Sequence, residues 1–116
     1  MKASDFVDVI NKVVREAAVV DAVSYLRDPP GRRPPPEVVA LSKWYNGLDA
    51  SNQAMVERLM DMVARDTVFG FLAVLDGVRQ VEGRGPKGDF ELRYIKDGRT
   101  YVLTDPSGEM LHELLD

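Results

Sequence analysis

An Asp-Gly pair at positions 97 and 98 stands between two segments in which apolar and polar residues alternate. Both central residues of a type I′ turn take positive φ angles, which Asp and Gly tolerate, so the pair predicts a two-residue turn within a β-hairpin over residues 90–104. The turn also sets the register, because pairing must proceed outward from Lys96 and Arg99. On this register one face of the hairpin is apolar and consists of Phe90, Leu92, Tyr94, Tyr101 and Leu103.

The opposite face of the hairpin is mostly polar, with Glu91, Arg93, Thr100 and Thr104 around two aliphatic side chains. Ile95 and Val102 lie diagonal to each other there, too few for a core but enough for the centre of a contact surface. A two-stranded hairpin is marginally stable alone, so its apolar face is expected to pack on a helix, most simply the one containing residues 68–75. The residues predicted to bind a partner protein are Arg93, Ile95, Lys96, Arg99 and Val102.

Apolar residues recur at three- and four-residue steps before the hairpin and predict helices. The first helix spans residues 4–27. Its apolar arc is wider than one stripe, so it is either nearly surrounded by its own chain or in contact with a second molecule. The prolines of residues 28–36 end this helix and predict an extended connector, because proline lacks a backbone N–H donor. The connector has no PxxP spacing, which favours a linker over a docking ligand.

Residues 36–77 form the second helical region. Pro36 suits the first position of one helix, and Asp49 suits the N-cap of the next. The run of residues 68–75 is apolar on all sides and is expected at the centre of the fold. The apolar positions of the helix after Asp49 that are expected to face inward are Met55, Val56, Leu59, Met60 and Val63.

A last short helix is predicted over residues 106–115, because Asp105 and Pro106 are typical of a helix start. Residues 78–82 are a candidate for a third strand. Together these elements predict one α+β domain over residues 1–116, with three to four N-terminal helices, a two- or three-stranded antiparallel hairpin or meander, and a short C-terminal helix. A compact monomer of this length has a radius of gyration of about 13 Å.

Composition excludes several classes of function. The chain has no cysteine, which removes disulfides, thiolate zinc sites and cysteine nucleophiles. The formal net charge of −4 disfavours nucleic acid as a partner. The chain begins without the apolar core of a signal peptide, and its apolar runs are too short to cross a bilayer. We expect a soluble cytoplasmic protein.

No set of residues predicts catalysis, a metal or a cofactor. His112 is the only histidine and is expected to be an exposed bystander. The glycine-rich segment 83–88 lacks the strand-then-helix context of a phosphate loop. Glu109 and Glu113 lie four residues apart, but without a calcium loop they are expected to stand in water.

The chain from about Leu41 to Asp116 resembles short, uncharacterised bacterial α+β proteins of the immunity-protein type. The likeness lies in the order of Leu-Ser-Lys-Trp-Tyr-Asn-Gly-Leu-Asp, a helix, Phe-Leu-Ala-Val-Leu-Asp-Gly, a hairpin and Asp-Pro-Ser-Gly-Glu-Met-Leu-His. It implies a bacterial cytoplasmic protein that binds another protein, and it carries no catalytic residues over.

The leading hypothesis is a non-enzymatic protein-interaction module, either an inhibitor of the immunity type or a homodimer built through residues 4–27. The alternative is a small-molecule or nucleotide-binding protein with Trp44 and Tyr45 in its pocket. Packing of these two aromatic residues in the core is the favoured interpretation.

Overall fold

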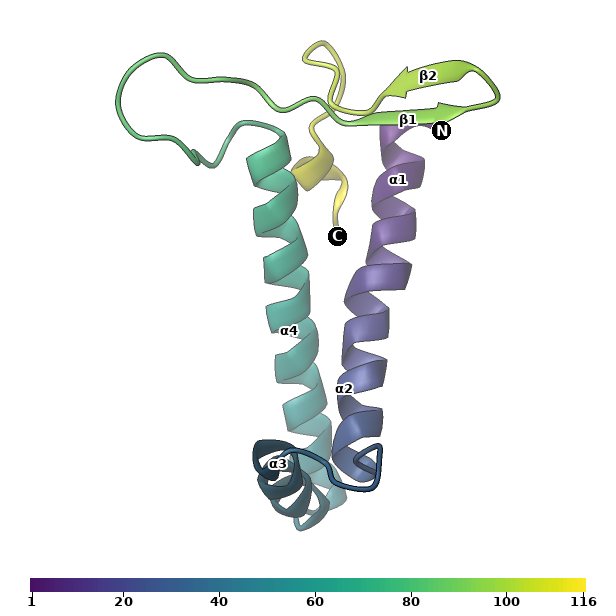
Figure 1. The fold of residues 1–116 in the computed structure, drawn as a ribbon, viewed down its shortest axis with the longest axis vertical. Coiled ribbons are helices and arrows are strands. Elements are labelled where there is room, and N and C mark those ends of the chain that lie inside the picture. Colours follow the sequence, from purple (N-terminus) through teal and green to yellow (C-terminus); the bar gives the residue numbers. More distant parts are fainter.

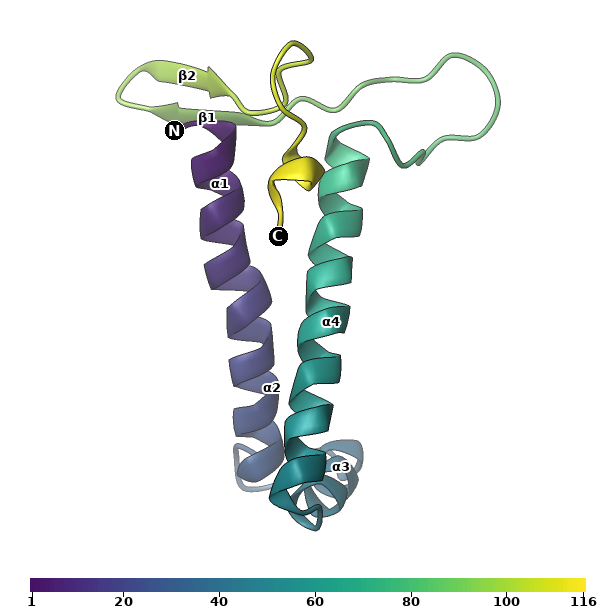
Figure 2. The same cartoon turned by 180° about the vertical axis from the view of Figure 1, so that it is seen from behind.

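The computed structural model describes residues 1–116 and shows two long helical arms that run antiparallel to each other (Figures 1 and 2). The first arm is one continuous helix built from α1, a π-helical segment η1, and α2. A short helix, α3, crosses the base and leads into the second arm, α4. A two-stranded sheet lies at the other end, beside a final 3-10 turn, η2. The bounds are α1 Ala3–Ile10, η1 Asn11–Glu16, α2 Ala17–Arg27, α3 Pro36–Asn46, α4 Ala50–Leu75, β1 Arg93–Lys96, β2 Arg99–Val102 and η2 Leu111–Leu114.

The helices begin and end at the residues whose chemistry favours those positions. Pro36 opens α3, where its missing N–H leaves no bond unmade. The Asp49 side chain accepts a hydrogen bond of 2.8 Å from the Asn52 N–H and caps α4. The first arm ends at Arg27, directly before the proline-rich connector. The predicted helical regions and the connector between them are therefore seen in the structure.

The hairpin has the predicted register. Arg93 pairs with Val102, Tyr94 with Tyr101, and Lys96 with Arg99 across the turn. Asp97 and Gly98 have φ angles of 51° and 74°, as a type I′ turn requires.

The strands are shorter than predicted, and the sheet has two strands, because residues 78–82 form no strand. Phe90 lies outside β1 and is exposed, so it does not belong to the apolar face. Tyr94 and Tyr101 are half-buried on one face, with ring centroids 6.1 Å apart.

The hairpin lies across the start of α1 and not, as predicted, along the 68–75 segment of α4 (Figure 1). Tyr94 and Tyr101 line a hollow together with Met1 and Asp5. The space beside α4 is taken by the C-terminal turn instead. Only the base of the hairpin reaches the core, through the buried Leu103 and the partly buried Leu92.

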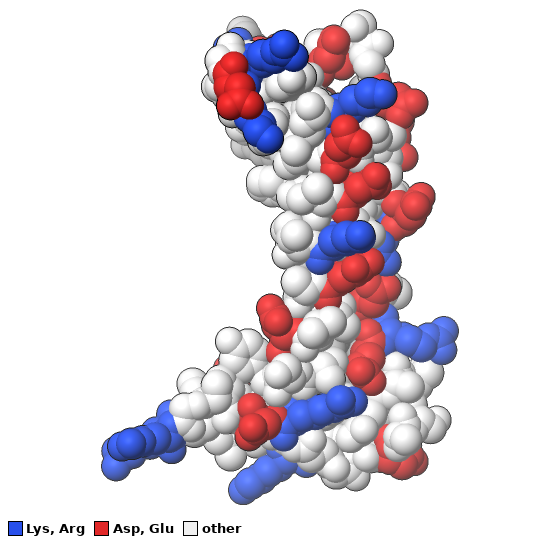
Figure 3. Space-filling view, turned by 90° about the vertical axis from the view of Figure 1, so that its right-hand side faces the viewer, with Lys and Arg blue, Asp and Glu red and all other residues white.

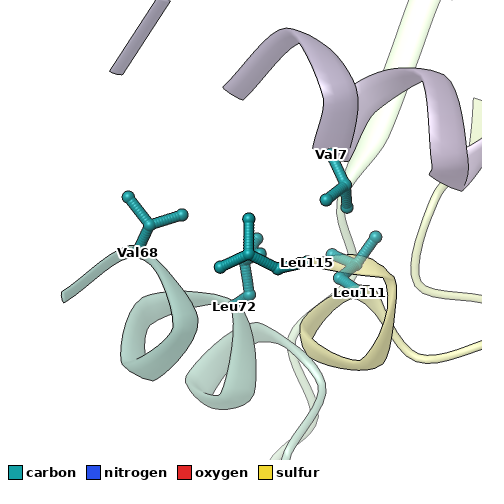
Figure 4. Close-up of a cluster of buried hydrophobic side chains, with 5 residues drawn as sticks. All are labelled: Val7, Val68, Leu72, Leu111 and Leu115. Atoms are coloured by element: carbon teal, nitrogen blue, oxygen red, sulfur yellow. The ribbon is translucent and has the colours of Figure 1, made fainter. Parts of the chain in front are cut away.

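The hydrophobic core sits at the hairpin end, where η2 lies between the two arms (Figure 4). The predicted C-terminal helix 106–115 is wrong, because only Leu111–Leu114 form a 3-10 turn. Asp105 accepts hydrogen bonds from the Ser107 N–H and hydroxyl, which closes a tight turn before a helix can start. The buried residues of the core cluster are Val7, Val68, Leu72, Leu111 and Leu115.

The molecule is elongated, and the expected compact shape is wrong. Its radius of gyration is 18.5 Å, against about 13 Å for a compact chain of this length. Only 11 of the 116 residues are buried. Between the core at one end and α3 at the other, the two arms have no third layer over them. An apolar face of the helix pair is therefore left uncovered.

Candidate protein-binding surface

An apolar groove of about 610 Å³ runs between the first arm and α4. Of its 13 lining residues, 11 are hydrophobic, which separates it from the charged or mixed hollows elsewhere on the molecule. We call this set the helix groove. Its residues are Val14, Arg15, Ala18, Val19, Ala22, Trp44, Val56, Leu59, Met60, Val63, Ala64, Thr67 and Val68.

The helix groove arises from the apolar periodicity of its two helices. On α4, Leu59 and Val63 lie one turn apart, and on the first arm Val14 and Ala18 do the same. Leu59 is 56% exposed and Val63 is 55% exposed, although both were predicted to face inward. The prediction was wrong because periodicity shows that a face is apolar and cannot show that this chain covers it.

Trp44 closes one end of the helix groove. It projects from α3 and is 55% exposed, so the expectation that it packs in the core is wrong. The neighbouring Tyr45 is fully buried, as expected, and its hydroxyl has no hydrogen-bond partner. The two adjacent aromatic residues therefore have different roles, and only Trp44 faces the groove.

The one charged residue of the helix groove is neutralised within the chain. Arg15 donates from Nε and Nη2 to the two carboxylate oxygens of Asp61, each at 3.0 Å. Its Nη1 donates to the Asn11 side chain at 3.0 Å and to the Asp116 carbonyl oxygen at 2.9 Å. The guanidinium group of Arg15 thus links the first arm to α4 and to the C-terminal segment by hydrogen bonds.

These contacts also perturb the two ionisable groups. The hydrogen bonds from Arg15 hold the pKa of Asp61 below its ordinary value, and the same bonds raise the pKa of Arg15. Both groups stay charged at neutral pH. A partner that lies over the helix groove therefore meets a paired arginine and no isolated charge.

The outer side of the first arm has a different character. Charged side chains of both signs follow one another along the side of the molecule that α1 and α2 form (Figure 3). Asp8, Lys12 and Glu16 are all exposed there. The arm is amphipathic, with a solvated outer edge and an apolar side toward the helix groove.

The five residues predicted to bind a partner lie together on the hairpin and are all exposed. Ile95 and Val102 lie on the same face as Arg93, which pairs with Glu91, whereas Lys96 and Arg99 lie on the opposite face with the half-buried tyrosines. This surface is at the hairpin end of the molecule, whereas the helix groove lies along the arms toward α3 (Figure 1). The two surfaces are separate.

His112 is not the exposed bystander that the sequence suggested, since its side chain is 13% exposed and meets an aspartate. Asp76 Oδ2 lies 2.6 Å from His112 Nδ1 and accepts from the His112 N–H at 2.8 Å. Asp76 Oδ1 accepts from the Leu111 N–H at 3.0 Å. The Phe69 ring packs edge-on against the imidazole. This arrangement joins the end of α4 to η2 and is structural.

The acidic residues form no cluster of three or more ligands that could hold a metal ion. None of the helices combines the length and the apolar content that crossing a bilayer requires.

Comparisons with known proteins found no family model, no curated protein and no solved structure that matches this chain.

Proposed function

We propose that this protein works by binding another protein, and that the helix groove is its main contact surface. The observation that carries the proposal is the half-exposed state of Leu59, Val63 and Trp44 within one continuous apolar surface. Scattered exposed apolar residues are normal on a monomer, but a contiguous apolar groove marks a site of contact.

The shape of the helix groove supports a protein partner. The first arm and α4 lie side by side and form a groove that suits the apolar face of another helix. Such a helix inserts side chains at three- and four-residue steps. Ala18, Ala22 and Ala64 leave room for such side chains. The volume also falls within the range of small-molecule pockets, but those sites enclose most of their ligand. Half-exposed walls support a protein over a small molecule.

The outer face of the hairpin is a second candidate contact surface for the inhibitor or immunity-type role. Ile95 is strongly exposed and shares its face with Arg93 and Val102, close to the turn that carries Lys96 and Arg99. An aliphatic centre next to a basic turn end, formed by Lys96 and Arg99, is suited to an acidic protein surface. The hairpin offers far less apolar area than the helix groove, so we assign it the secondary role.

Photo-crosslinking in the native cell tests the proposal. A photoreactive phenylalanine analogue replaces Leu59 in one variant and Ile95 in a second, and mass spectrometry identifies what each one captures. We expect position 59 to crosslink to a specific protein, which can be another copy of the chain, and to do so more efficiently than position 95. Capture only at position 95 would assign the main contact surface to the hairpin instead of the helix groove. No protein captured at either position would refute the proposal.

A further inference from the structure

We infer that the helix groove is covered by a second copy of this chain, so that two pairs of arms form one four-helix core around a twofold axis. This inference rests on the proposed function and names its partner. It follows from the exposed area, from the position of the core and from the symmetry of the exposed face.

The exposed area exceeds that of a compact monomer. The surface accessible to solvent is 8679 Å², whereas a compact monomer of 13.0 kDa exposes about 6,300 Å². The surplus is about 2,300 Å². Obligate homodimers bury roughly 1,000–2,500 Å² per chain. The surplus belongs to the whole elongated chain, including the exposed loop before β1, and it is large enough to supply an obligate interface.

The position of the core shows why the cover must be permanent. The buried cluster of Val7, Val68, Leu72, Leu111 and Leu115 holds only the hairpin end together. The middle of the arms contributes few buried side chains, so the folded state depends on what lies over the helix groove. A transient partner would leave the chain unstable whenever the partner dissociated. A second copy of the chain is always present where the first is made, and obligate homodimers often have no stable folded monomer.

The geometry of the face suits a twofold arrangement. The groove is formed by two antiparallel helices of similar length, and α4 with its 26 residues extends about 39 Å. Two such pairs stacked face to face have the architecture of a four-helix bundle, in which helices cross at about 20°. A twofold interface uses the same patch on both copies, so side chains such as Leu59 and Met60 enter the space beside the alanines of the other copy.

The charges on this face are compatible with the arrangement. Arg15 and Asp61 already form a two-point ion pair within one copy. Covering them buries an ion pair without net charge, which costs less desolvation free energy than covering a lone charge. The remaining charges of the first arm lie on its outer edge and stay in water (Figure 3).

Sedimentation velocity on the full chain tests the inference, with the single tryptophan as a local reporter. We expect a dimer whose Trp44 emission is blue-shifted and protected from acrylamide. Leu59→Glu should weaken the dimer at least about 100-fold, because it places a charge in the interface. Ile95→Glu is the matched control, since Ile95 is 67% exposed but lies on the hairpin, and it should leave the dimer intact.

A crosslinking experiment covers the case in which Leu59→Glu fails to fold. The chain has no cysteine, so Val63→Cys introduces a single thiol into the helix groove. A flexible bismaleimide should join two copies through this position, and Ile95→Cys should give little product. A dimer that Leu59→Glu leaves intact and that Val63→Cys does not crosslink would place the interface elsewhere and overturn the inference.

A folded wild-type monomer with accessible Trp44 would also overturn it. In that case, capture of a different protein from position 59 would leave the proposed function standing. Native mass spectrometry would reveal a bound small molecule as added mass on the monomer, and this result would refute both.

Discussion

Asp76→Ala should release the C-terminal turn from the end of α4. The Asp76 side chain is 3% exposed and accepts from two backbone N–H groups, those of the fully buried Leu111 and of His112, and it also contacts the His112 ring. Each buried donor left without a partner costs about 1–3 kcal/mol. Two such donors and the lost ring contact give an expected destabilisation of about 3–4 kcal/mol.

Urea denaturation of wild type and variant measures this loss at one fixed protein concentration, because the stability of the proposed dimer would depend on concentration. Hydrogen exchange supplies a local readout, in which the Leu111 and His112 amides should lose protection first. His112→Ala removes only the ring contact and the packing on Phe69, so its effect should be about 1–2 kcal/mol.

Asp105→Ala is the matched control, because Asp105 also accepts hydrogen bonds from a following residue but lies in an exposed turn. Water replaces the lost acceptor there, and the expected cost is below about 1 kcal/mol. The reasoning would be refuted if Asp76→Ala were as mild as Asp105→Ala, or if residues 111–115 kept their protection.

Three further changes test other parts of the structure. Leu72→Ala should cost about 3 kcal/mol in urea denaturation, because Leu72 is buried in the core cluster and its truncation leaves a cavity. Asp61→Asn should flatten the acid side of the profile of stability against pH. The hydrogen bonds from Arg15 lower the pKa of Asp61 in the folded state, so the ionised Asp61 contributes its full stabilisation above about pH 4. This contribution is lost as the pH falls through the pKa of Asp61 in the folded state. Thermal unfolding between about pH 2 and pH 6 checks this, and an unchanged acid limb would contradict it. Gly98→Ala should destabilise the hairpin by about 1 kcal/mol because the φ angle of Gly98 is 74°, whereas Gly88→Ala in an open loop should be neutral. Hydrogen exchange of the strand amides should be faster in the Gly98 variant and unchanged in the Gly88 variant.

Features that depend on neighbouring residues were predictable from the sequence, and features that depend on distant contacts were not. The helix ends at Pro36 and Asp49 and the turn at Asp97-Gly98 were predictable, because caps and turns depend on a few neighbouring residues. The C-terminal helix was wrong because Asp76, more than thirty residues away, binds the backbone that a helix would have used. No local pattern contains that contact.

The candidate surface was predicted only in part. The wide apolar arc of residues 4–27 indicated a helix that is either nearly surrounded by its own chain or in contact with a second molecule, and the structure leaves part of that arc open in the helix groove. The contribution of α4 was missed, because Leu59 and Val63 look like core residues in sequence. Trp44 was named as a pocket residue only in the alternative hypothesis, because the favoured interpretation placed it in the core.

The amino-acid sequence by itself determined where the helices begin and end, how the two strands pair, and which side of each element is apolar, since these depend on backbone preferences and on the spacing of neighbours. Only the tertiary structure decided which apolar sides meet within one chain. The C-terminal turn fills the space between the arms at one end and α3 covers the other, so the faces of Leu59 and Val63 are left exposed. Burial depends on what lies opposite a residue, and that is a property of the whole fold.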